Sequence, residues 1–66
     1  MKLLTILLAD GGSPVEVLVH DKARPVEKAM SRRDPGLFLD AEDGPDIAGI
    51  ALYPWTAIIC VSERDA

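Results

Sequence analysis

The segment Lys2–Leu8 constrains the fold more than any other part of the chain, because it is apolar at nearly every position. Successive side chains of a β-strand point to opposite faces of the sheet. The two faces of this strand would carry Leu4, Ile6 and Leu8 on one side and Leu3, Thr5 and Leu7 on the other. Such a strand is buried on both faces, or is buried on one and meets another chain on the other. Leu3, Thr5 and Leu7 are therefore candidate interface residues.

The same segment also has the order of a secretory signal peptide, in which a positive residue precedes an apolar run. Two features favour a strand instead: Thr5 interrupts the run, and the turn Asp10–Gly12 follows it at once. No part of the chain approaches the ~20 apolar residues that span a bilayer. The sequence therefore predicts a cytoplasmic protein without a membrane partner.

The chain has few means of stabilising a small core. Its 66 residues predict one domain over residues 1–66, and a single core of this size supplies only ~3–5 kcal/mol of stability. Cys60 is the only cysteine and His20 the only histidine, so neither an intramolecular disulfide nor a His/Cys zinc cluster can form. We expect no metal and no cofactor. Association with a second copy is the remaining means of stabilisation.

Alternating hydrophobicity and turn residues predict four further strands. The clearest covers residues 15–20, where the three valines share one face and Glu16, Leu18 and His20 share the other. The other three strands are expected over residues 37–39, 47–53 and 57–62. The segment 40–46 holds four acidic residues with Gly44 and Pro45, which is typical of an exposed turn.

The hydrophobic period changes to that of a helix between Asp21 and Arg33. Asp21 is the expected N-cap, and Pro25 is tolerated in the first turn, where its missing N–H has no intrahelical partner. One apolar face with i, i+3, i+4 spacing would carry Val26, Ala29 and Met30. Asp34-Pro35-Gly36 ends the helix. A helix this short with so narrow an apolar stripe must pack on a sheet.

Together these elements predict an α+β fold: a small antiparallel sheet with the order β-β-α-β-β, followed by the strand-like end at residues 57–62, and one helix packed on the sheet. The pattern of hydrophobic and turn residues that leads to this prediction runs through Leu3–Gly11, Val15–Val17, Gly36–Phe38 and Ile50–Glu63. It resembles small phage- and actinobacteria-encoded proteins of unknown function, which implies a bacterial cytoplasm, or a host cytoplasm for a phage protein. The same pattern is similar to SH3-like and Sm-like small barrels, in which strands continue around a bent sheet.

A basic cluster lies within the predicted helix. Five of the seven basic residues, but one of the eleven acidic residues, fall in residues 22–33, which gives this segment a net charge of +4. The basic residues are Lys22, Arg24, Lys28, Arg32 and Arg33. Such a face binds an anionic partner, or is only a solvated helix surface. The chain's net charge of −4 and the lack of an interleaved aromatic residue disfavour nucleic acid.

Tyr53-Pro54-Trp55 is the most distinctive local motif. Tyr53 and Trp55 form either a docking platform for a peptide or small molecule, or a core plug at the turn before the last strand. Cys60 is expected to be a buried, inert thiol. His20 is expected on the solvent side of its strand. Nothing pairs these two side chains, so the sequence predicts no catalytic residue.

These observations predict a non-enzymatic accessory or interaction protein, phage-derived, that acts through protein–protein contacts as a homo-oligomer. One alternative is a small nucleic-acid-binding or regulatory module that uses the basic face of residues 22–33. A second alternative is a small-molecule or peptide binder, or an inhibitor of a host protein, that uses Tyr53 and Trp55.

Overall fold

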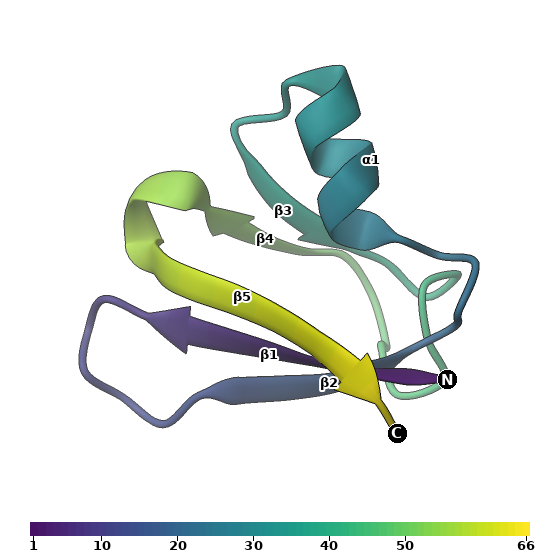
Figure 1. Ribbon diagram of the computed structural model, residues 1–66. Coiled ribbons are helices and arrows are strands. Elements are labelled where there is room, and N and C mark those ends of the chain that lie inside the picture. Colours follow the sequence, from purple (N-terminus) through teal and green to yellow (C-terminus); the bar gives the residue numbers. More distant parts are fainter.

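The computed structural model describes residues 1–66 as one helix and five strands (Figure 1). The strands are β1 (Lys2–Leu8), β2 (Val15–Val19), β3 (Gly36–Leu39), β4 (Ala51–Pro54) and β5 (Ile58–Asp65), and the helix is α1 (Pro25–Arg32). A single turn of 3₁₀ helix, η1 (Trp55–Ala57), joins β4 to β5. The predicted α+β fold, with one helix packed on antiparallel strands, is confirmed.

The strands form two antiparallel sheets. β1 is the central strand of a three-stranded sheet with the order β2-β1-β5, and β3 pairs with β4 in a two-stranded sheet. In the barrel alternative, hydrogen-bonded strands continue around one bent sheet. Here the strand pairing does not continue from one sheet to the other. Because β1 and β5 are antiparallel, the two chain ends lie side by side (Figure 1), and the amide of Ala66 donates to the carbonyl oxygen of Met1 at 3.3 Å.

The hydrophobic core lies between the two sheets and the helix. Its fully buried hydrophobic residues are Leu4, Ile6 and Val19 from the three-stranded sheet, Ala29 from α1, and Leu37 and Leu39 from β3. Leu8, Val15 and Val17 are half-buried and pack against this cluster. The predicted inward faces of the first two strands are therefore correct, and they follow directly from the two-residue period of a strand.

The helix begins three residues later than predicted. Arg24 is the N-cap residue, with φ 46°, and no side chain caps this end of α1. Asp21 instead forms an ion pair with the N-terminal ammonium group of Met1. The ammonium nitrogen lies 2.9 Å from Asp21 Oδ1. This contact lowers the pKa of Asp21 through the hydrogen bond and the charge of the ammonium group. Pro25 occupies the first turn as predicted.

The buried face of α1 also differs from the predicted one. Pro25 and Ala29, four residues apart, are the buried residues of the helix, and Val26 is half-buried. Met30 is 69% exposed. Because successive helical residues turn by about 100°, a helix that buries Pro25 and Ala29 directs Met30 away from the sheet. The predicted place of Met30 in the apolar face was wrong.

A β-bulge in the three-stranded sheet changes which residues of β5 face the core. Leu7 of β1 pairs with Cys60, but Leu8 pairs with Ile58, so Ile59 is an extra residue on β5. The extra residue breaks the alternation. As a result Ile58 and Val61 pack against the core, and Cys60 is exposed. The prediction of a buried thiol was wrong for this reason.

The acidic segment after β3 is more structured than an exposed turn. The side chain of Asp43 is only 4% exposed and accepts hydrogen bonds from Lys28 Nζ at 3.0 Å and from the amide of Asp40 at 2.9 Å. Gly44 is buried against the backbone of Leu18, where a side chain would collide with the carbonyl oxygen. These contacts hold the segment against the end of β2. The following strand starts at Ala51 rather than at residue 47.

Candidate functional site

The outer face of the three-stranded sheet carries the candidate residues of β1. Leu3 lies between Leu18 of β2 and Arg64 of β5, and Thr5 lies between Glu16 and Ser62. Leu7, the third candidate, lies beside Cys60. Leu3, Thr5, Leu7 and Leu18 are half-buried, although neither α1 nor the second sheet packs on this face.

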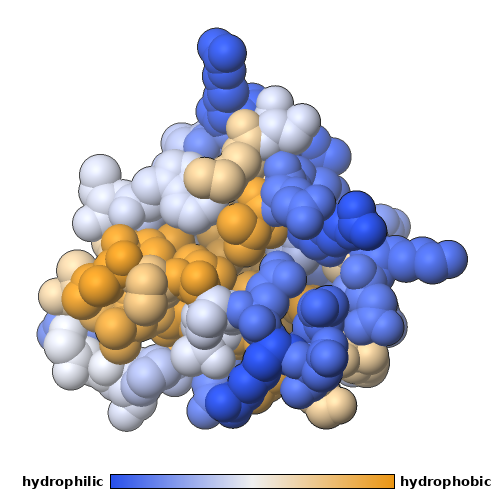
Figure 2. Space-filling model, viewed as in Figure 1, coloured by the Kyte–Doolittle hydropathy of each residue, from blue (hydrophilic) through white to orange (hydrophobic).

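The apolar part of this face lies toward the end of β1. Figure 2 shows hydrophobic surface concentrated where β1 ends and β5 begins, with hydrophilic surface around it. Ile59, the extra residue of the bulge, is 62% exposed there. On the same face Glu16, beside Thr5, and Arg64, beside Leu3, form an ion pair across β1, with 3.8 Å between Oε2 and Nη2. The face thus combines an apolar area with one charge of each sign.

The structure places Tyr53 and Trp55 against the core. Both side chains are half-buried and pack on the buried cluster between the sheets. The indole Nε1 of Trp55 donates to the carbonyl oxygen of Asp34 at 2.8 Å. Of the two interpretations of this motif, the positions of the side chains favour the core plug.

A second exposed apolar pair was not singled out from the sequence. Phe38 of β3 and Leu52 of β4 are cross-strand partners on the outer face of the two-stranded sheet and are 42% and 44% exposed. Ile50, just before β4, is 80% exposed. The alternation of Leu37-Phe38-Leu39 around an exposed aromatic residue was the available signal, since it places Phe38 opposite the two leucines.

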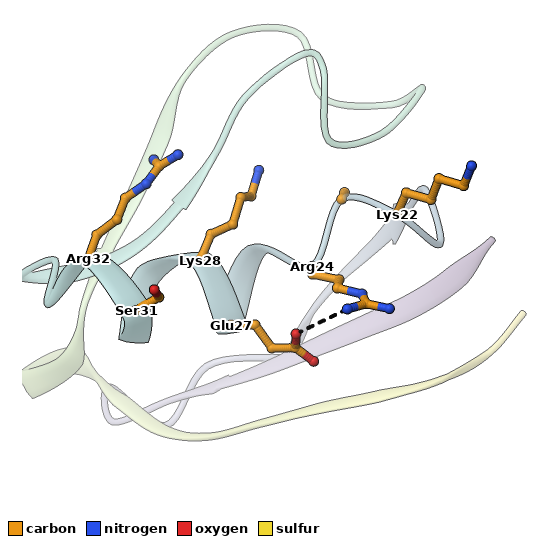
Figure 3. Close-up of a pocket in the computed structure, with 7 residues that line it drawn as sticks. Lys22, Arg24, Glu27, Lys28, Ser31 and Arg32 are labelled. Atoms are coloured by element: carbon orange, nitrogen blue, oxygen red, sulfur yellow. Dashed lines mark ion pairs between the residues drawn. The ribbon is translucent and has the colours of Figure 1, made fainter.

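The basic residues of the helix line a shallow hollow of about 350 Å³ along α1 (Figure 3). Its walls are formed by Lys22, Ala23, Arg24, Glu27, Lys28, Ser31 and Arg32. Four of the five predicted anion-binding residues are therefore brought together. The fifth, Arg33, is the C-cap residue of α1, with φ 57°, and does not line the hollow.

Two of the four cations in the hollow have carboxylate partners. Lys28 Nζ lies 3.0 Å from Asp43 Oδ1, and Arg24 Nη1 lies 3.7 Å from Glu27 Oε2. Lys22 and Arg32 make no ion pair. In Figure 3 the side chains of Lys22, Lys28 and Arg32 extend to the same side of the helix, whereas Arg24 turns toward Glu27. The lining residues carry a net charge of +3.

The two side chains considered for catalysis, His20 and Cys60, lie on different segments of the chain. His20 is exposed just after β2, and Cys60 is exposed in β5. No three His, Cys, Asp or Glu side chains are grouped so that they could hold a metal ion. Helix α1 is neither long nor apolar enough to cross a membrane.

No protein-family model, no curated protein and no solved structure matches this chain. The resemblance to small phage and actinobacterial proteins therefore stays a prediction.

Proposed function

We propose that this chain is a non-enzymatic interaction protein of the cytoplasm that associates with a second copy through the outer face of its three-stranded sheet. The observation that carries the proposal is the row of Leu3, Thr5 and Leu7 on a face that no other element of the chain covers. Apolar side chains left at such a surface gain free energy when a partner removes them from water.

The charges at the edge of the face fit a second copy. In a two-fold symmetric dimer the same patch is used twice, so that each residue type on one copy meets its complement on the other. Glu16 and Arg64 provide one negative and one positive group on the same face. Because Glu16 and Arg64 pair within one copy, they add no net charge to the contact, and a partner copy packed face to face meets an apolar area of the same size.

The small area of the face indicates a weak association. Three strands about 4.8 Å apart and a central strand of 7 residues at about 3.3 Å each give a footprint of roughly 330 Å². Stable interfaces bury about 800 Å² per partner. We therefore expect a weak dimer with a dissociation constant of about 10–100 µM.

Sedimentation equilibrium between about 10 µM and 1 mM tests the proposal. The chain should pass from monomer to dimer over this range, and Leu7→Lys should remain monomeric while keeping its circular dichroism spectrum. Ile50→Lys is the matched control, because Ile50 is 80% exposed just before β4, outside the three-stranded sheet, so this substitution should not affect dimerisation. The proposal is contradicted if the chain stays monomeric at 1 mM, or if Ile50→Lys rather than Leu7→Lys abolishes dimerisation.

The salt dependence distinguishes an apolar interface from an electrostatic one. Two copies that each carry −4 repel one another, and added salt screens this repulsion. Association through the apolar face should therefore strengthen as salt rises. Weakening with salt would point instead to a contact between the basic hollow of one copy and acidic residues of the next.

A further inference from the structure

We infer that the hollow along α1 is a binding site for a compact polyanion of the oligophosphate class. The inference goes beyond the proposed self-association and does not depend on it, since the hollow and the outer face of the three-stranded sheet share no residue. It rests on the separation of charge along the chain, on the spacing of the cations, and on the uncapped end of the helix.

The positive charge of the chain is concentrated at this site. Residues 22–33 hold five of the seven basic residues and one of the eleven acidic residues, so this segment carries +4 and the rest of the chain −8. A local positive patch on an acidic protein attracts anions that are small enough to lie within it. The negative charge of the rest of the chain repels larger anions that extend beyond the patch.

The spacing of the cations favours a ligand with several negative groups. Arg24, Lys28 and Arg32 are each four residues apart, which places successive positions about 6 Å apart along the helix axis. Lys22 extends the row beyond the start of α1, and Figure 3 shows it on the same side as Lys28 and Arg32. A single anion reaches one of these groups, whereas a chain of phosphates reaches several.

The N-terminus of α1 adds to the positive potential at one end of the hollow. No side chain caps this end, and the three residues before the helix proper, residues 22–24, all line the hollow. The dipole of a helix N-terminus favours a negative group beside it. The backbone thus supports the same class of ligand as the side chains.

The ion pairs of the hollow identify the residues that are free to bind. Asp43 holds Lys28, and Glu27 faces Arg24, so Lys22 and Arg32 are the cations without a carboxylate partner. Asp43 is buried and fixes the position of Lys28 at the wall of the hollow. Glu27 is exposed and competes directly with a bound phosphate.

The size of the molecule argues against a long nucleic acid. The chain measures 27 × 26 × 21 Å, and the Debye length at physiological salt is about 8 Å. A nucleic acid strand that continued past the hollow would therefore run within one or two Debye lengths of a surface with a net charge of −8. A compact oligophosphate avoids this repulsion.

Titration of the full chain with sodium tripolyphosphate, followed by amide chemical shifts, tests the inference. We expect saturable shifts in residues 22–32 and a dissociation constant about 5-fold weaker for Lys22→Ala and for Arg32→Ala. Arg33→Ala is the matched control, because it removes the same charge from the next residue, which does not line the hollow. It should change the constant less than about 2-fold. Glu27→Gln should tighten binding by removing the competing carboxylate.

Three results would overturn the inference. The first is the absence of saturable shifts at millimolar tripolyphosphate. The second is equal weakening by Arg33→Ala and Arg32→Ala, which would show a general charge effect rather than binding in the hollow. The third is tighter binding of a single-stranded oligothymidylate than of tripolyphosphate, which would favour the nucleic-acid-binding alternative. Only variants whose circular dichroism spectra match that of the parent chain are compared, so that each comparison is made between folded chains.

Discussion

The indole Nε1 of Trp55 donates a hydrogen bond to the carbonyl oxygen of Asp34 at 2.8 Å, across 21 positions of the chain. The amide of Trp55 donates to the carbonyl oxygen of Pro35 at 3.3 Å. These two bonds connect the end of the helical segment to the turn that leads into β5. The one Trp of the chain therefore ties the two-stranded sheet to the strand that completes the other sheet.

Replacing Trp55 tests this link. Trp55→Phe keeps most of the apolar area but leaves the Asp34 carbonyl without its donor, which should cost about 1–2 kcal/mol. Trp55→Ala should cost about 2–4 kcal/mol, somewhat less than at a fully buried position, and so unfold much of the population. Urea unfolding followed by circular dichroism measures both. Tyr53→Phe is the control, because the Tyr53 hydroxyl makes no hydrogen bond within the chain; an equal loss for Tyr53→Phe would contradict the account.

The buried carboxylate of Asp43 should contribute to stability. Asp43→Ala removes the acceptor of Lys28 Nζ and of the Asp40 amide, and we expect a loss of about 1–3 kcal/mol in the free energy of unfolding. Glu42→Ala, which changes the neighbouring exposed acid, should stay within about 0.5 kcal/mol of the parent chain. Similar losses for the two variants would show that net charge, rather than these hydrogen bonds, sets the effect.

Two glycines provide a matched pair of substitutions. A Cβ at Gly44 would collide with the carbonyl oxygen of Leu18, whereas a Cβ at Gly49 meets nothing within 4 Å. Gly44→Ala should therefore lower the free energy of unfolding by about 1–3 kcal/mol or more. Gly49→Ala should be neutral or slightly stabilising. Thermal unfolding of the two variants side by side measures the difference, and a neutral Gly44→Ala would mean that the segment does not pack on β2 as described.

The pH dependence of stability should report the ion pair between Met1 and Asp21. The N-terminal ammonium group lowers the pKa of Asp21 below its ordinary value of 3.8. A carboxyl whose pKa is lower in the folded state stabilises the fold above its unfolded pKa, and this contribution is lost as the pH falls through the folded value. The melting temperature of Asp21→Asn should therefore lie below that of the parent chain at pH 6, and the difference should shrink below pH 3.8.

Asp46→Asn serves as the control for this experiment, because Asp46 makes no ion pair. Its melting temperature should follow that of the parent chain at each pH. A constant difference between Asp21→Asn and the parent chain from pH 6 to pH 2 would exclude the ion pair as the cause.

The fold could be predicted from the sequence where local patterns decide it. The alternation around Val15, Val17 and Val19 sets the inward face of β2, and Pro25 marks the first turn of the helix, because both signals depend only on backbone geometry. The helix N-cap could not be predicted in the same way. Asp21 is a good capping residue, but the ammonium group of Met1 reaches it through the pairing of distant segments.

The remaining differences also arise from tertiary contacts. The bulge between Leu7 and Leu8 exposes Cys60, and nothing in the sequence of β5 marks an extra residue there. Asp43 is buried because Lys28, fifteen positions earlier, supplies its partner. For the candidate sites, the basic residues of 22–32 could be found from their spacing on a helix. The separation of Arg33 from this group depends on where the helix ends.

The most direct test of the proposed self-association is an isotope-filtered nuclear Overhauser experiment on a mixture of labelled and unlabelled chains at about 1 mM, well above the expected dissociation constant. We expect contacts between copies from the methyl groups of Leu3, Leu7 and Leu18. Contacts from Ile50 or Leu52 instead, or no contact between copies at all, would contradict it.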